Sequence, residues 1–207
     1  MDRLMRFVLA VLFASLSLLP AGAAAGAAAA AAAAVVATET VRDGVLDMEY
    51  PVVSGIDAAA ARAINVTLAG HREQFRAAIA ADPYVREAVS RFEVQRNSDG
   101  ILSLTVTDYQ FSGGAHGMSV MKGYSFDLAS GYLYRFDDLI PPWGRDQVTQ
   151  AVAQQINDKK IPLLHSFTGL AAEPDFYLQP DRKLVVFYQL YELAPYAWGF
   201  VRFPVSY

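Results

Sequence analysis

The 207-residue chain contains no cysteine. This absence excludes disulfide bonds, thiol catalysis and cysteine-based zinc sites, and it leaves no thiol to which a lipid anchor could be attached. A folded domain of this chain must therefore be stabilised by its hydrophobic core, without covalent cross-links.

Histidine is also scarce, and the three present are His71, His116 and His165. No His-x-x-x-His or Glu-x-x-His pattern joins them, so the sequence predicts no metal site. No Gly-Lys-Ser/Thr sequence follows the glycine-rich loop, so the phosphate-binding fingerprint is absent. We expect no cofactor. We interpret His71 as a core or boundary residue of a helix and His165 as an ordinary loop residue.

Charge of either sign is moderate. The chain has 17 Lys and Arg residues against 21 Asp and Glu residues, a formal net charge of −4. A mild acidic excess argues against a nucleic-acid partner, since phosphate backbones are bound by basic surfaces. It is compatible with a basic partner, and equally with solubility alone.

The N-terminus has the pattern of an export signal. Arg3 and Arg6 precede an apolar run over residues 7–19, and small residues follow. We predict a signal peptide over residues 1–23, with an uncertain cleavage site, and an Ala-rich low-complexity linker over residues 24–44. The protein is then periplasmic or secreted. If the signal were retained, the apolar segment would be an N-terminal membrane anchor.

The remaining residues, 45–207, predict one α+β domain with an antiparallel sheet and two main helices. Asp57 is a candidate N-cap, and apolar residues recur at helical spacing as far as residue 81. A short helical turn is expected to extend to residue 89. We predict strands over residues 45–53, 122–128 and 132–136, and a further strand at the C-terminus. Two hairpins are predicted, one pairing 92–96 with 101–111 and the other pairing 176–178 with 184–188, and a second helix covers residues 145–159.

One loop, FSGGAHGMS at residues 111–119, has three possible interpretations. Its glycines allow a sharp turn, so it can be a tight connection between strands. It can also be an exposed recognition loop. Finally, Ser112 and His116 could be a nucleophile and a base, oriented by Asp108 or Asp127, although no Gly-x-Ser-x-Gly motif is present.

The chain also resembles a known family. The segments YQFSGGAHG (109–117) and YELAPYAWG (191–199), together with the closing residues 203–205, are similar to domain of unknown function 3298, which is usually preceded by a 4163-type segment. That family resembles the extracytoplasmic part of lysozyme-responsive anti-sigma factors and the accessory domain of some peptidoglycan deacetylases. The resemblance covers residues 45–207.

The resemblance implies where a ligand would bind. In the sensing members, loops around these two motifs engage the lysozyme cleft. Only six residues precede the apolar segment, where a sigma-binding region would be expected, and no deacetylase domain is evident. Carried over to this chain, the candidate binding residues are Ser112, Gly113, Gly114, His116, Gly117, Glu192, Pro195, Tyr196 and Trp198, and Tyr191 is a further amphipathic aromatic residue beside them.

Together these observations predict an exported, non-catalytic binding module of the cell envelope. Its partner would be a lysozyme-like protein or peptidoglycan. Two alternatives stay open at this point: a cell-wall hydrolase or esterase that uses Ser112 and His116, and a structural envelope protein without a ligand.

Overall fold

A computed structural model describes residues 33–207. The predicted signal peptide, 1–23, lies outside the described residues. None of the helices in this part of the chain is both long and apolar enough to span a membrane. The elements are β1 (Val35–Asp43), β2 (Leu46–Ser54), α1 (Ala58–Ala81), β3 (Glu87–Ser98), β4 (Ile101–Phe111), β5 (Met118–Asp127), α2 (Phe136–Leu139), α3 (Pro142–Asp158), β6 (Phe176–Gln179), β7 (Lys183–Tyr188), the 3₁₀ helix η1 (Tyr196–Trp198) and β8 (Val201–Ser206).

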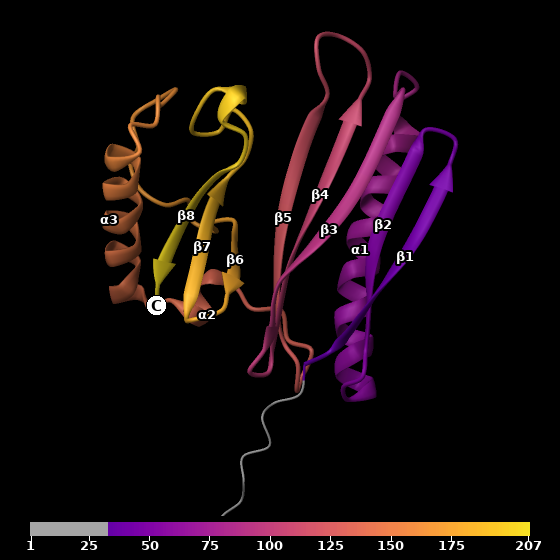
Figure 1. The fold of residues 1–207 in the computed structure, drawn as a ribbon, viewed down its shortest axis with the longest axis horizontal. Coiled ribbons are helices and arrows are strands. Elements are labelled where there is room, and N and C mark those ends of the chain that lie inside the picture. The colour runs from indigo at the N-terminus through magenta and orange to yellow at the C-terminus, as the bar shows by residue number, and fades with distance from the viewer. Residues whose placement is uncertain (1–32) are drawn as a thin grey trace, which may run out of the picture.

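The strands form two sheets, with orders β1-β2-β3-β4-β5 and β6-β7-β8. Figure 1 shows α3 at one end of the molecule beside the small sheet, and α1 along one face of the large sheet near β2 and β3. The predicted α+β class, with two main helices in a single domain, is confirmed. The larger sheet is not purely antiparallel, however, because β2 and β3 run parallel. The reason is that α1 connects them as a crossover, which a hairpin cannot replace.

Helix α1 follows its sequence signals closely. The Asp57 carboxylate accepts hydrogen bonds from the backbone N–H groups of Ala59 and Ala60, which confirms the predicted N-cap. The predicted apolar stripe is buried at Ala60, Ile64, Leu68, Phe75 and Ile79. Its middle part packs on alternate residues of β4, namely Leu102, Leu104 and Val106. The same face of β4 continues toward the candidate site with Asp108 and Gln110.

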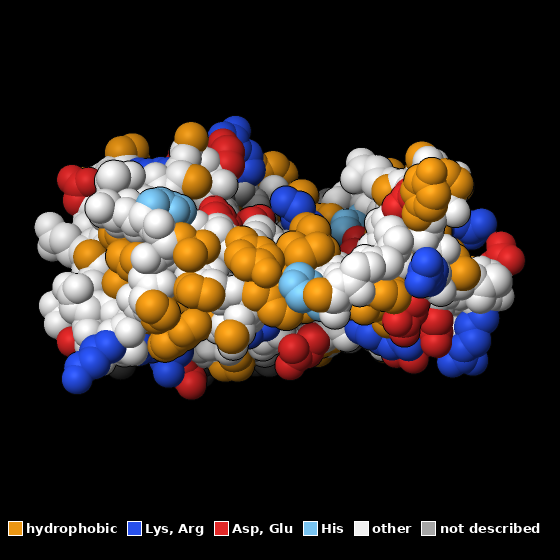
Figure 2. All heavy atoms as spheres, turned by 90° about the horizontal axis from the view of Figure 1, so that it is seen from above, with side chains coloured by type: hydrophobic (Ala, Val, Ile, Leu, Met, Phe, Trp, Pro, Cys, Tyr) orange, Lys and Arg blue, Asp and Glu red, His pale blue; other side chains and the backbone are white. Residues whose placement is uncertain are grey.

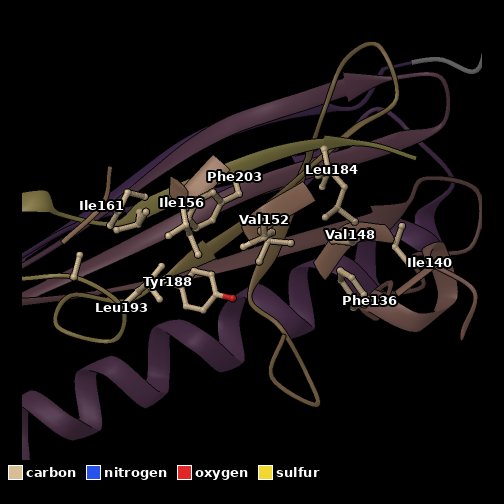
Figure 3. Packing of buried hydrophobic residues seen from close by; sticks show 14 of the residues in the cluster. Phe136, Ile140, Val148, Val152, Ile156, Ile161, Leu184, Tyr188, Leu193 and Phe203 are labelled. Carbon is tan, nitrogen blue, oxygen red and sulfur yellow. The ribbon is translucent and has the colours of Figure 1, made fainter. Parts of the chain in front are cut away.

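The second core lies between α3 and the small sheet. Figure 3 shows Val148, Val152 and Ile156 of α3 facing Leu184 of β7 and Phe203 of β8. All of these side chains are buried, since alternate strand residues and every third or fourth helix residue point into the same space. This core fixes the position of the loop between β7 and β8.

The two sheets are held together by close backbone contacts at β5. A Cβ atom built on Gly123 would lie 1.9 Å from the carbonyl oxygen of Phe176, so only glycine fits there. The Gln189 side chain bonds both backbone groups of Met121, accepting from its N–H at 3.0 Å and donating to its carbonyl at 2.8 Å. Gln189 thereby occupies part of the free edge of β5, and the strand and the β7–β8 loop are fixed together.

Two boundaries differ from the sequence predictions. Residues 35–43, predicted as part of the linker, form strand β1, and Ala34 exchanges two hydrogen bonds with the Asn97 side chain. The folded domain therefore begins before residue 45. The helical turn expected through residue 89 is wrong, because strand β3 already begins at Glu87 and pairs with Phe111.

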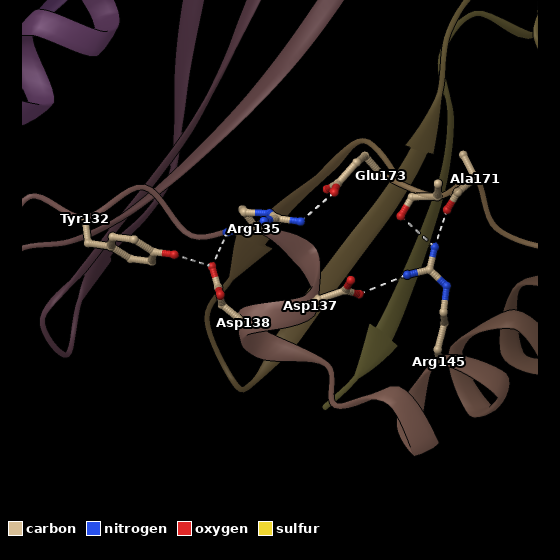
Figure 4. Close-up of polar contacts among 8 residues, drawn as sticks. Tyr132, Arg135, Asp137, Asp138, Arg145, Ala171 and Glu173 are labelled. Atoms are coloured by element: carbon tan, nitrogen blue, oxygen red, sulfur yellow. Dashed lines mark hydrogen bonds and ion pairs between the residues drawn. The ribbon is translucent and has the colours of Figure 1, made fainter.

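The strand predicted over residues 132–136 is also wrong. Only Leu133 pairs with a strand residue, Phe126, and helix α2 begins at Phe136. The cause is a polar cap, shown in Figure 4: the Asp138 carboxylate accepts hydrogen bonds from the Arg135 N–H at 2.7 Å and the Tyr132 hydroxyl at 2.9 Å. The Asp138 carboxylate thus satisfies the backbone N–H of Arg135, which in a strand would have needed an acceptor on a neighbouring strand.

Candidate functional site

The loop between β4 and β5 depends on its glycines. Gly113 and Gly114 have φ angles of 112° and 93°, which side-chain-bearing residues rarely adopt. Gly117 has a different role, since a Cβ atom there would lie 2.4 Å from ring atoms of Tyr109. These glycines therefore let the chain reverse and bring the exposed His116 toward the second sheet.

His116 meets two tyrosines of the β7–β8 loop. Its ring stacks on Tyr196 with centroids 4.1 Å apart and an interplanar angle of 21°. Tyr191 lies 6.5 Å from His116 and 5.5 Å from Tyr196, centroid to centroid. Such contacts contribute about 0.5–1.5 kcal/mol per pair beyond area burial. We call His116, Tyr191 and Tyr196 the aromatic cluster.

Hydrogen bonds define the tautomer of His116. Its Nδ1 lies 2.9 Å from the carbonyl oxygen of Gly117, and a carbonyl can only accept, so Nδ1 carries the proton. Nε2 of the neutral ring is then the acceptor for the Tyr191 hydroxyl at 3.4 Å. The Tyr196 hydroxyl donates to the same Gly117 carbonyl at 3.3 Å. One backbone oxygen thus links both loops.

The remaining candidate residues of the β7–β8 loop shape it. Pro195 precedes η1, and its carbonyl accepts from the N–H of Trp198 at 2.9 Å. The Glu192 carboxylate accepts from the N–H of Gln189 at 2.7 Å, so it closes a turn of the loop. Tyr191 has a φ of 63°, a left-handed conformation that costs free energy and is frequent at functional sites.

An exposed apolar surface surrounds the aromatic cluster. Tyr191 and Trp198 are 47% and 43% exposed, and Met118 and Val120 of β5 are 43% and 50% exposed. Figure 2 looks onto the end of the molecule that carries both loops and shows hydrophobic side chains gathered near its middle. Met118 and Val120 were not singled out from the sequence, because the strand was predicted to begin only at residue 122, whereas β5 begins at Met118.

The predicted catalytic arrangement is not assembled. The Ser112 hydroxyl donates to Asp82 at 2.7 Å, and Gln110 donates to both of them. The hydrogen bond from Ser112 is the main cause that holds the pKa of Asp82 below its ordinary value. Within residues 33–207, no hydrogen bond joins Ser112 and His116. Of the two proposed orienting acids, Asp127 accepts from the backbone of Ser130 in a turn.

The other acid, Asp108, belongs to a polar cluster that sequence reasoning missed. Asp108 Oδ2 lies 2.9 Å from Nε2 of His71, and Oδ1 accepts from the Ser90 hydroxyl at 2.6 Å. The Tyr124 hydroxyl lies 2.8 Å from His71 Nδ1. Burial, and then the charges of Asp108 and Asp175, raise the pKa of Tyr124 to about 12. Tyr124 therefore remains a hydrogen-bond donor at neutral pH.

No group of three or more possible metal ligands stands together within residues 33–207. The prediction that His71 is a core or boundary residue agrees with its place between α1 and the sheet, where its side chain is 13% exposed. His165 lies in a loop between α3 and β6, as predicted.

Comparison with known proteins identifies the two parts of the chain. A family model described as a protein of unknown function, DUF3298, matches residues 137–207. The chain carries a DUF3298 domain. A second model, described as deacetylase PdaC, matches residues 38–119. The PdaC-type part includes the β4–β5 loop, and the DUF3298 part includes the β7–β8 loop, so the aromatic cluster joins the two. The resemblance to DUF3298 inferred from the sequence is confirmed.

Two solved structures of DUF3298 proteins share the fold. One, from Bacteroides fragilis, is 17% identical with a TM-score of 0.52, and the alignment covers 84% of this chain and 89% of that one. The other, from Pseudomonas aeruginosa, is 16% identical with a TM-score of 0.51 and the same coverage of both chains. A search of curated protein sequences gives no match.

Proposed function

We propose that the chain is an exported, non-catalytic binding module of the cell envelope, and that it recognises a lysozyme-like protein through the aromatic cluster and Trp198. The observation that carries the proposal is the stacking of His116 on Tyr196. It joins two loops that are far apart in the sequence, and both were singled out by resemblance to lysozyme-sensing proteins.

The chemistry of this surface suits protein recognition. Tyrosine and tryptophan provide large contact areas at a low cost in conformational entropy, and they are enriched among residues that dominate binding energies. Hydrogen bonds at Gly117 hold His116 and Tyr196 in place before a partner arrives, which lowers the entropic cost of binding. The net charge of −4 would favour encounter with a basic partner.

The contacts of Ser112 and His116 favour binding over catalysis. A nucleophilic serine needs a base within hydrogen-bond reach, whereas the Ser112 hydroxyl donates to an ionised carboxylate, Asp82. His116 in turn is occupied by Gly117 and Tyr191. The PdaC-type and DUF3298 parts also support a role as an accessory domain of the cell envelope.

Isothermal titration calorimetry of the full-length chain with a c-type lysozyme tests the proposal. We expect saturable binding, and we expect His116→Ala and Tyr196→Ala each to weaken it at least tenfold, about 1.4 kcal/mol. His165→Ala, in an exposed loop, is the matched control and should bind like the wild type. Absence of binding, or unchanged affinity in both loop variants, would overturn the proposal. Retention of the chain on peptidoglycan alone would replace lysozyme by a cell-wall ligand.

A further inference from the structure

A pocket of about 620 Å³ opens beside the aromatic cluster. It lies between the second half of α1 and the adjoining parts of β4 and β5, and the β4–β5 loop forms part of its rim. His116 and Gly117 belong both to this rim and to the contacts of the aromatic cluster. A ligand bound to the exposed aromatic surface could therefore extend a side chain into the pocket.

The pocket has apolar walls and a polar floor. Phe75 and Ala78 of α1 stand on one side, and Met118 and Val120 of β5 stand on the other. Asp108 and His71, each with a side chain 13% exposed, form part of the lining where these walls converge. This combination fits a ligand group with an apolar stem and a polar end.

Asp108 lacks a permanently charged partner. Its only ion-pair contact within residues 33–207 is with His71, which is charged only when protonated. Lys122 also lines the pocket, but its ammonium lies 3.6 Å from Asp175 on the side of the second sheet. A largely buried carboxylate without a fixed cation is costly, and a cationic ligand would offset that cost.

The neighbouring amides favour a planar cation with several donors. Gln110 uses its Nε2 to donate to Asp82 and Ser112, which leaves its carbonyl oxygen as an acceptor in the same pocket. Gln74 lines the pocket as well. A guanidinium group has five N–H donors in a fixed plane, so it can donate to a carboxylate and to an amide oxygen at the same time. A single ammonium group is less suited to this arrangement.

We propose that the pocket takes the side chain of an arginine from the protein partner, with the aliphatic stem between α1 and β5 and the guanidinium at Asp108. The protein source of this arginine rests on the proposed function. The preference of the pocket for an alkylguanidinium does not, because it depends only on Asp108, the carbonyl oxygen of Gln110 and the apolar walls.

The first test uses butylguanidinium as the probe and neutral butylurea as its isostere, each titrated into the full-length chain and followed by NMR. We expect saturable shifts of the His71 and Tyr124 ring signals with butylguanidinium, and at least tenfold weaker binding of butylurea. Equal affinity of the two probes, or shifts that avoid both rings, would overturn the inference.

Substitutions in the pocket test where butylguanidinium binds. Asp108→Asn should weaken butylguanidinium binding at least tenfold. Because this change could also disturb folding, Ala78→Trp is a second variant that fills the pocket from an exposed position of α1, and Ala77→Trp is its matched control outside the pocket. Binding that survives Ala78→Trp unchanged would contradict the inference.

The outcomes separate the two proposals. If butylguanidinium binds at Asp108 but lysozyme does not, the lysozyme proposal fails and the preference of the pocket stands. If lysozyme binds with equal affinity to the wild type and to Ala78→Trp, the aromatic surface is sufficient and the arginine proposal fails.

Discussion

The imidazole of His116 stacks on the phenol ring of Tyr196, and both residues bond the same carbonyl oxygen, that of Gly117. One residue belongs to a loop of the five-stranded sheet and the other to a loop of the three-stranded sheet. The stack is therefore a tertiary contact that depends on how the two sheets pack. Any change that separates the sheets should also move His116 away from Tyr196 and thereby disrupt the candidate binding surface.

Gly123→Ala tests that packing. The added methyl group would overlap the backbone of Phe176, which cannot move without separating β5 from β6. We expect the free energy of unfolding to fall by about 3 kcal/mol or more. Gly70→Ala is the matched control, at an exposed position of α1 with no atom within 4 Å of the new Cβ, and it should raise stability by about 0.5–1 kcal/mol. Urea denaturation measures both, and similar effects of the two changes would contradict the packing described.

The fold was predictable from the sequence where signals are local. The cap and apolar stripe of α1, and the pairing of the two predicted hairpins, depend on neighbours a few residues away, and these elements formed as predicted, although β3 continues to Ser98 and leaves only residues 99–100 in the first turn. Strand β1 was not predicted, because its short β-branched segment directly follows an Ala-rich run and was assigned to the same low-complexity linker. The helix α2 was missed because its cap at Asp138 competes with strand pairing.

The candidate site was predictable only in its parts. Each loop could be selected from its residues and from the family resemblance, but neither the residues nor the resemblance reveals that His116 contacts Tyr196. The pair of His71 and Asp108 was hidden for the same reason, since one lies on α1 and the other on β4. Their approach depends on helix-to-sheet packing, which no spacing along the chain encodes.

Tyr124→Phe tests the environment of the His71 cluster at alkaline pH. The pKa of Tyr124 is raised from 10.0 to about 12 in the folded chain, so the folded state keeps a proton that the unfolded state releases. The stabilising contribution of this proton is full below pH 10 and is lost as the pH rises from 10 to 12. We therefore expect the wild type to lose more stability than Tyr124→Phe over that interval, measured by urea denaturation at several pH values. Identical slopes would contradict the burial of Tyr124.

Ser112→Ala tests the structural role assigned to Ser112. Since the hydrogen bond from Ser112 is the main cause of the lowered pKa of Asp82, its removal should raise that pKa toward the ordinary value. Carboxyl ¹³C NMR titration measures the change. Ser119→Ala, on β5 and without a hydrogen bond to Asp82, is the control and should leave the pKa unchanged. A constant Asp82 pKa in Ser112→Ala would show that Ser112 is free for another role.

The most direct test of the central claim is a double-mutant cycle for lysozyme binding with His116→Ala, Tyr196→Ala and the double variant, each confirmed as folded. If the two residues form one binding surface through their stack, their effects are coupled, and the double variant should lose little more affinity than the more damaging single variant. Strictly additive losses, or no measurable binding by the wild type, would contradict the claim that the two loops act together as a lysozyme-recognition site.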